Sequence, residues 1–127
     1  NAIEVALYNY SQDKEASIDK DKLIKDALFL KVKGVYQKIL LDDILYIKSE
    51  HVYLEIFLKD KSTILIRASF TDILERLTKD FIRTHRSYIV NTKYISQIEN
   101  GFLRINDKAL PVGKKYRQLI LDQINYI

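Results

Sequence analysis

The chain has 127 residues, of which 30% are charged, and a formal net charge of +4. This length suits one domain with a modest core, and the absence of cysteine excludes a disulfide framework and a thiolate zinc site. The longest apolar runs are interrupted by Lys, Asp or Arg, so the sequence predicts no membrane span, no signal peptide and a cytoplasmic location.

The charge is unevenly distributed along the chain. Residues 1–30 carry four lysines against six carboxylates, a net charge of −2, which leaves +6 for the remainder. A basic domain that follows an acidic segment is typical of a domain that meets a polyanion. The chain contains no Met and begins with Asn1-Ala2. We therefore expect a piece of a longer protein, and we interpret the first residues as a candidate cloning scar.

The N-terminal segment, residues 1–27, is predicted to be a linker that contains a short amphipathic helix. Apolar residues stand near helical spacing from Ile18 to Leu28, and the helix is expected to begin near Asp19. From Phe29 onward the pattern changes to that of β-strands. The sequence therefore predicts one folded domain over residues 28–127.

Strand patterns fill the first half of this domain. Apolar or alternating runs predict strands at residues 29–33, 36–41, 44–48, 52–58 and 63–67. Gly34 separates the first two as a hairpin, and Ser49-Glu50-His51 forms a turn between the third and the fourth. Ser69 and Asp72 then match the capping box of a short helix that extends to Leu77.

The second half predicts a meander and a terminal helix. Strands at residues 94–98, 102–105 and 108–112 are separated by Asn100-Gly101 and Asn106-Asp107 turns. A helix from Lys114 to Ile124 follows, and its first turn is basic although a helix N-terminus favours negative charge. Either an anion compensates this charge or the side chains are simply solvated, and both interpretations stay open.

The stretch F-I-R-T-H-R-S-Y-I-V-N, from Phe81 to Asn91, concentrates two arginines and one of the two histidines. The basic cluster is predicted to stand where a strand begins, which suits contact with phosphates or base edges. The alternative is a pair of ordinary solvated charges at Arg83 and Arg86. His85 is expected to be buried and hydrogen-bonded rather than a reader, and Asn91 is expected to cap or turn the backbone.

Several linked motifs in one order give a specific resemblance. The runs L-D-D-I-L-Y-I-K-S-E, S-F-T-D-I-L-E-R-L, R-T-H-R-S-Y-I-V-N and L-P-V-G-K-K-Y-R-Q-L resemble the LytTR DNA-binding domain of bacterial response regulators, over about residues 28–124. The resemblance implies a mainly β, elongated fold of about ten strands, with a short internal helix and a C-terminal helix. It also implies that loops, not a recognition helix, enter successive major grooves.

The resemblance implies three base-contacting residues. Arg86 stands at the family's base-contacting position in the R-x-H-x-S-[YF] segment. Lys114 stands near the second such position, where the family more commonly has Ser-Arg; Gly113-Lys114 replaces a guanidinium fork by a point charge. His51, in the turn of residues 49–52, is the third candidate.

Four further residues are expected to contact phosphates, which sets register without reading sequence. They are Arg83, Ser87, Lys115 and Arg117. The predicted function is sequence-specific binding of double-stranded DNA by the output domain of a two-component response regulator in a phosphorelay. The expected partners are direct-repeat promoter sites, an upstream receiver domain and a second copy in a weak homodimer on DNA.

Three other function classes were weighed. An enzyme would pair a histidine with Asp42, Asp43, Asp72 or Asp80, but the sequence holds no catalytic or phosphate-cradling motif, so we expect no enzyme, cofactor or metal. A β-rich protein-interaction module with a basic face explains the charge and is the main alternative. An RNA-binding domain would need aromatic strand signatures that the sequence lacks.

Overall fold

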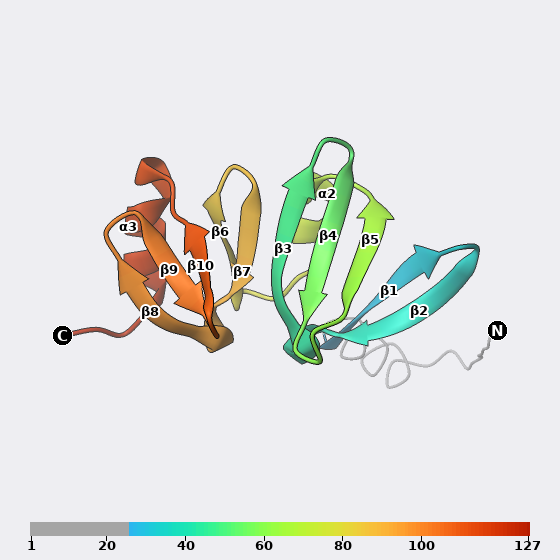
Figure 1. Cartoon of the computed structure of the whole chain (residues 1–127), viewed down its shortest axis with the longest axis horizontal. Helices are drawn as coiled ribbons and strands as arrows, with labels where there is room; N and C mark the ends of the chain where they lie inside the picture. Colours follow the sequence, from blue (N-terminus) through green and yellow to red (C-terminus); the bar gives the residue numbers. More distant parts are fainter. Residues whose placement is uncertain (1–25) are drawn as a thin grey trace, which may run out of the picture.

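The computed structural model describes residues 26–127, which form three antiparallel sheets and two α-helices. Figure 1 shows the sheets side by side along the longest axis, with the C-terminal helix at one end. The predicted mainly β, elongated fold of about ten strands is confirmed. None of the helices in the described range is long and apolar enough to cross a membrane.

The central sheet has five strands in the order β5-β4-β3-β7-β6. Its core positions are in register across the three inner strands, where Ile47 pairs with Ile56 on one side and with Ile89 on the other. All three side chains are completely buried. The strands are β3 (Ile44–Glu50), β4 (Tyr53–Leu58), β5 (Thr63–Arg67), β6 (Phe81–His85) and β7 (Tyr88–Asn91).

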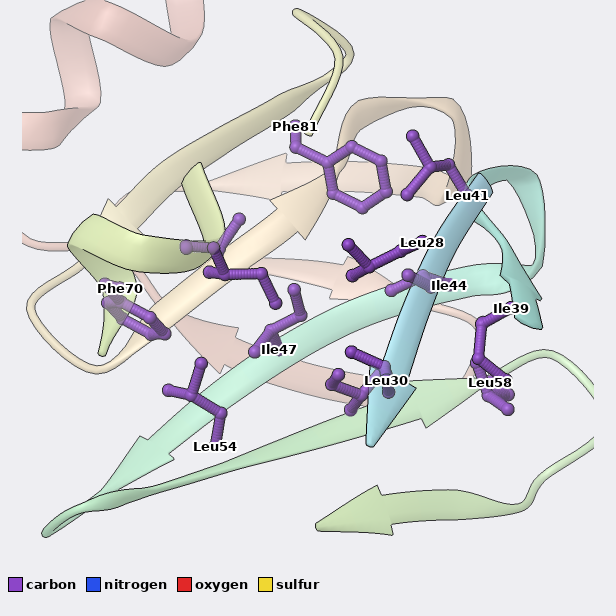
Figure 2. Close-up of a cluster of buried hydrophobic side chains, with 13 residues drawn as sticks. Leu28, Leu30, Ile39, Leu41, Ile44, Ile47, Leu54, Leu58, Phe70 and Phe81 are labelled. Atoms are coloured by element: carbon purple, nitrogen blue, oxygen red, sulfur yellow. The ribbon is translucent and has the colours of Figure 1, made fainter. Parts of the chain in front are cut away.

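A two-stranded hairpin and a short helix cover one face of the central sheet. Strands β1 (Ala27–Val32) and β2 (Val35–Leu40) form the hairpin, and α2 (Phe70–Leu74) follows β5. Figure 2 shows Leu28 and Leu30 of β1 in the same cluster as Phe70 of α2 and Ile47 of β3. This hydrophobic cluster is the first of two cores, and it fixes the hairpin against the sheet.

A second hydrophobic cluster holds the three-stranded sheet and the C-terminal helix. This sheet has the order β10-β9-β8, and helix α3 adds Ile120 to the cluster. A register shift in β3 places Leu45 and Tyr46 in this second cluster while Ile44 and Ile47 stay in the first. The elements are β8 (Ile95–Glu99), β9 (Phe102–Ile105), β10 (Lys108–Pro111) and α3 (Lys114–Gln123).

Local signals in the sequence are confirmed at two points. The Oγ of Ser69 accepts a hydrogen bond from the amide of Asp72 at 3.2 Å, and the Asp72 carboxylate accepts one from the amide of Ser69. The helix that they cap ends at Leu74 rather than Leu77. Asn91 caps a 3₁₀ helix (η2, Thr92–Tyr94) as predicted, by accepting from the amide of Lys93, and its buried Nδ2 donates to the carbonyl of Ile44.

One prediction of secondary structure is wrong. Ala27 and Leu28 belong to β1, not to a helix, because they pair with Leu40 and Ile39 across the hairpin. The rest of the helix predicted from Asp19 lies outside the described residues. The basic cluster spans two strands: Arg86 and Ser87 directly precede β7, as predicted for a cluster where a strand begins, whereas Arg83 and His85 lie in β6, which pairs with β7 as a hairpin. The predicted domain boundary between residues 27 and 28 stays a prediction.

Candidate nucleic-acid interface

Two turns of the central sheet meet at one end of it. The β3–β4 turn carries His51, and the β6–β7 turn carries Arg86. Because β3 and β7 run antiparallel, with Lys48 opposite Tyr88, the end of β3 lies beside the start of β7. Figure 1 shows both turns at the upper edge of the molecule. The amide of Ser49 donates a hydrogen bond of 2.9 Å to the carbonyl of Ser87, which joins the two turns directly.

The N-terminus of α3 lies at the same edge. The amide of Gly113, the N-cap residue, donates a 2.8 Å hydrogen bond to the carbonyl of Thr84 in β6. Lys114 follows as the first residue of the helix and is exposed. The three residues predicted to contact bases therefore occupy three neighbouring loops, and backbone hydrogen bonds connect these loops in series.

The β6–β7 turn is held in one conformation by side-chain hydrogen bonds. The half-buried His85 accepts a hydrogen bond on Nδ1 from the amide of Ser87 at 3.1 Å. This contact confirms the expectation that His85 is hydrogen-bonded within the fold. The Arg86 side chain is exposed, whereas its carbonyl accepts from Arg83. A fixed turn with an exposed guanidinium suits recognition of a planar hydrogen-bonding edge.

The His51 turn has its own backbone constraint. His51 is exposed and adopts φ 58°, in the left-handed region that few residues other than glycine and asparagine prefer. This conformation reverses the chain between β3 and β4. Sequence patterns placed the turn at residues 49–51, but β3 extends to Glu50, so the turn itself is His51 and Val52.

The residues predicted to contact phosphates differ in solvent exposure and in their hydrogen bonds within the protein. Lys115 is exposed, with its Nζ 5.4 Å from the centre of the Tyr116 ring. Arg117 is exposed and donates from Nη1 to Oδ1 of Asn100 at 3.0 Å, which ties α3 to the β8–β9 turn. Ser87 is half-buried, and its backbone makes two of the bonds that hold the turn.

Arg83 is the predicted phosphate contact with the most intramolecular partners. It is half-buried, and its guanidinium donates from Nη2 to the carbonyl of Arg86 at 2.8 Å and from Nε to the carbonyl of His85 at 3.4 Å. The rings of Phe70 and Tyr116 lie 5.1 and 5.9 Å from its central carbon. Sequence reasoning missed these partners, because contacts between β6, α2 and α3 leave no local pattern.

Two lysines at the other end of the central sheet, Lys59 and Lys93, are paired with carboxylates. Lys93 lies 2.7 Å from Asp42 and 3.7 Å from Asp80, and Lys59 lies 3.2 Å from Asp43. The hydrogen bond with Asp42 raises the pKa of Lys93, and the hydrogen bond with Asp43 raises that of Lys59. These carboxylates precede β3 and β6, so they stand far along the strands from the turns.

The cations at the interface edge differ from Lys59 and Lys93 in having no carboxylate partner among the described residues. Within residues 26–127, no carboxylate forms an ion pair with Arg86, Lys114 or Lys115. These charges stand at the edge that the three loops share, whereas Lys59 and Lys93 at the opposite end have carboxylate partners.

In the described range of residues, neither histidine lines the groove beside the β1–β2 hairpin. This groove, of about 930 Å³, lies between the hairpin and β5. In the same range, no group of three His or carboxylate residues is placed to hold a metal ion. His51 lies in the β3–β4 turn and His85 is the last residue of β6.

Comparisons with known proteins identify the fold and the family of the chain. The chain matches no curated protein. Its structure is similar to a LytTr DNA-binding domain from Bacillus cereus, of a protein described as a methyl-accepting/DNA response regulator. The two are 23% identical with a TM-score of 0.68, and the match covers 80% of this chain and 99% of that one. At this identity the likeness shows the fold.

A comparison with protein-family models assigns the chain to a family. The model of the LytTr DNA-binding domain matches residues 35–125, which include all three loops of the interface edge. This family is one of DNA binding in transcription regulation and not of catalysis. The protein belongs to the LytTR family of DNA-binding domains.

Proposed function

We propose that this domain recognises a specific sequence of double-stranded DNA by inserting loops into the major groove. The observation that carries the proposal is the pair of backbone hydrogen bonds, Ser49 to Ser87 and Gly113 to Thr84, that joins the three basic loops at one edge. Loops fixed in this way present side chains with constant spacing, which base recognition requires. The central sheet supplies the rigid support.

The three loops have different roles in this proposal. Arg86 donates its guanidinium fork to the O6 and N7 of a guanine, the commonest specific contact in the major groove. Lys114 contributes a point charge, and His51 contributes a ring nitrogen to a base edge. Successive loops along an elongated edge then read successive groups of base pairs.

Phosphate contacts by Lys115, Arg117 and Ser87 set the register of the domain on the duplex. Lys115 stands in the first turn of α3, beside Lys114, so it reaches the backbone next to the groove that Lys114 enters. Each neutralised phosphate releases counterions, so affinity falls as salt rises. The guanidinium of Arg83 instead donates hydrogen bonds within the protein, to the carbonyls of His85 and Arg86.

The wider setting proposed is that of an output domain in a two-component response regulator, in the cytoplasm. Support comes from the Bacillus cereus neighbour, which is described as part of a response regulator. In this setting an upstream receiver domain controls occupancy, and two copies bind direct repeats with weak contact between them. A single-domain interface with one cationic edge fits side-by-side binding of this kind.

Selection from a pool of random duplexes tests the proposal. The 127-residue chain is incubated with the pool at near-physiological salt, and the bound fraction is sequenced over several rounds. Enrichment of a short repeated motif is the expected result. Retention without enrichment would overturn sequence reading and leave electrostatic DNA binding alone.

The same experiment separates the alternative function. A β-rich protein-interaction module with a basic face would retain no duplex at this salt. In the selection, a variant with Lys114 and Lys115 both replaced by Gln provides the control for charge. This control should recover less DNA, since α3 would lose both exposed cations of its first turn.

A further inference from the structure

One guanidinium donates two hydrogen bonds to the backbone at the tip of the β6–β7 hairpin. Arg83 bonds the carbonyls of both His85 and Arg86, at 3.4 and 2.8 Å. It stands next to a register shift in the pairing of β6 with β7, where Arg83 lies opposite Ile89 but His85 lies opposite Tyr88. A register shift makes the backbone pairing near the turn less regular. The Arg83 guanidinium donates hydrogen bonds to backbone carbonyls at this point.

The same guanidinium contacts two helices. Phe70 of α2 and Tyr116 of α3 both lie within cation–π distance of it. Tyr116 in turn packs against the N-cap of α3, since a Cβ on Gly113 would lie 3.0 Å from its ring. Contacts therefore run from the Arg86 turn through Arg83 and Tyr116 to the N-terminus of α3.

We propose that Arg83 is a positioning residue that fixes the Arg86 turn relative to the first turn of α3, so that Arg86 and Lys114 meet the DNA together. This inference rests on the proposed function of the interface edge. The sequence suggested a direct phosphate contact for Arg83. The half-buried side chain, with two backbone carbonyls bonded and two aromatic rings against it, favours the positioning role.

A lysine cannot replace arginine in this role. Two donors from one planar group reach two carbonyls while the flat face of the group lies against aromatic rings. An ammonium keeps the charge but loses this combination of fork and stacking. Arg83→Lys therefore separates the two roles, because a phosphate contact needs mainly charge whereas positioning needs shape.

The binding test compares Arg83→Lys and Arg83→Ala with the unchanged chain, on the selected duplex and on a random duplex over a salt series. Positioning predicts that Arg83→Lys weakens binding to the selected duplex about tenfold, the equivalent of one charged hydrogen bond. Binding to random DNA and the salt slope should stay unchanged. Direct phosphate contact predicts the reverse: Arg83→Lys binds normally and Arg83→Ala lowers the salt slope by about one on both duplexes. That result would overturn the proposal.

A second measurement does not depend on sequence reading. Amide hydrogen exchange of Ser87 and Gly113 reports the bonds to His85 and Thr84 in the free protein. Arg83→Lys should speed exchange at both amides, whereas Lys108→Gln, which removes one positive charge at an exposed position of β10, should change neither. Unchanged exchange in Arg83→Lys would overturn the proposal. If the duplex selection finds no motif but exchange rises at both amides, the positioning role stands and only the reading function fails.

Tyr116→Leu is the second variant. Its predicted effect is limited to one of the two amides, which distinguishes it from general misfolding. It removes the aromatic ring on the α3 side while the bonds from Arg83 to the turn remain. Faster exchange at Gly113 with normal exchange at Ser87 is expected. Equal effects at both amides would contradict a path of contacts that passes through Tyr116.

Discussion

The amide of Ser49 and the carbonyl of Ser87 form a 2.9 Å hydrogen bond between the turns that carry His51 and Arg86. The bond lies beyond the last β3–β7 pair, Lys48 with Tyr88, so it extends the ladder to the edge of the sheet. Both turns therefore move as parts of one sheet. Side chains of the two turns are expected to act on neighbouring base pairs.

His51→Gly is expected to separate stability from recognition at the first turn. Glycine adopts the φ of 58° without steric cost, which stabilises the folded protein, but it also adds conformational freedom to the unfolded chain. Because these effects oppose each other, the free energy of unfolding should change by less than about 1 kcal/mol. The imidazole is lost, so binding to the selected duplex should weaken. Urea denaturation and duplex titration measure the two effects.

Asn106→Gly is a matched control for His51→Gly. Asn106 also has a positive φ, of 55°, but it stands in the β9–β10 turn, away from the interface edge. It should show the same small change in stability with no change in DNA affinity. Equal affinity of His51→Gly and the unchanged chain for the selected duplex would remove His51 from the set of readers.

Arg86→Ala is expected to reduce the preference for the selected duplex over random DNA by about 1–3 kcal/mol. The physical reason is loss of a bidentate contact that only the correct base completes. Competition titrations against random duplex measure the preference. Lys115→Ala, by contrast, should weaken all duplexes equally and lower the salt slope by about one. An equal loss on both duplexes for Arg86→Ala would count against its reading role.

Lys114→Arg is expected to sharpen base preference at its position. A guanidinium fork bonds guanine at two points, whereas an ammonium offers one charge that several bases accept. Repeating the duplex selection with this variant should enrich guanine at one position of the motif. Lys114→Gln is the control, and it should lose preference at the same position. An identical motif for all three chains would show that residue 114 does not read bases.

The parts of the fold that local chemistry determines were predictable from sequence. The glycine of the Asn100-Gly101 turn has φ 99°, a conformation that glycine adopts without steric cost. The Ser69 and Asp72 capping box formed because both partners lie within one helical turn. Likewise, the positions of the basic loops followed from the order of strands and turns.

The parts that depend on pairing between distant segments were not predictable. Ala27 and Leu28 fit a helical apolar pattern, but pairing with β2 makes them a strand. Nothing near Arg83 in the sequence indicates that Phe70 and Tyr116 lie against its guanidinium. Tertiary contacts override local propensity at such positions.

Tyr46→Phe is expected to protect the fold at alkaline pH. Burial raises the pKa of the Tyr46 hydroxyl above its usual range, and the nearby Tyr88 and Glu55 raise it further. Because the unfolded chain ionises first, stability is complete below about pH 10 and falls as pH rises through the folded pKa. Phenylalanine cannot ionise, so this loss of stability at alkaline pH should disappear. Urea denaturation at neutral and at alkaline pH measures the difference in the free energy of unfolding. Tyr126→Phe, at an exposed position, should leave the alkaline fall in place. An equal fall in Tyr46→Phe would contradict the argument.

Thr84→Val is expected to raise the free energy of unfolding by about 1–3 kcal/mol. Thr84 is fully buried, and its hydroxyl has no hydrogen-bond partner within the described residues. Valine has nearly the same shape, so it removes a desolvated polar group without leaving a cavity. The Thr84 carbonyl still accepts from Gly113, so DNA affinity should not change.

Thr92→Val provides the matched comparison for Thr84→Val, since the Thr92 hydroxyl donates to the carbonyl of Asp80 at 2.8 Å. Losing this bond should lower the free energy of unfolding by about 0.5–1.5 kcal/mol, opposite in sign to the Thr84 effect. Urea denaturation of both variants measures the pair. A lower stability for Thr84→Val would show that its hydroxyl is hydrogen-bonded in the folded protein, and the contrast between the two threonines would then disappear.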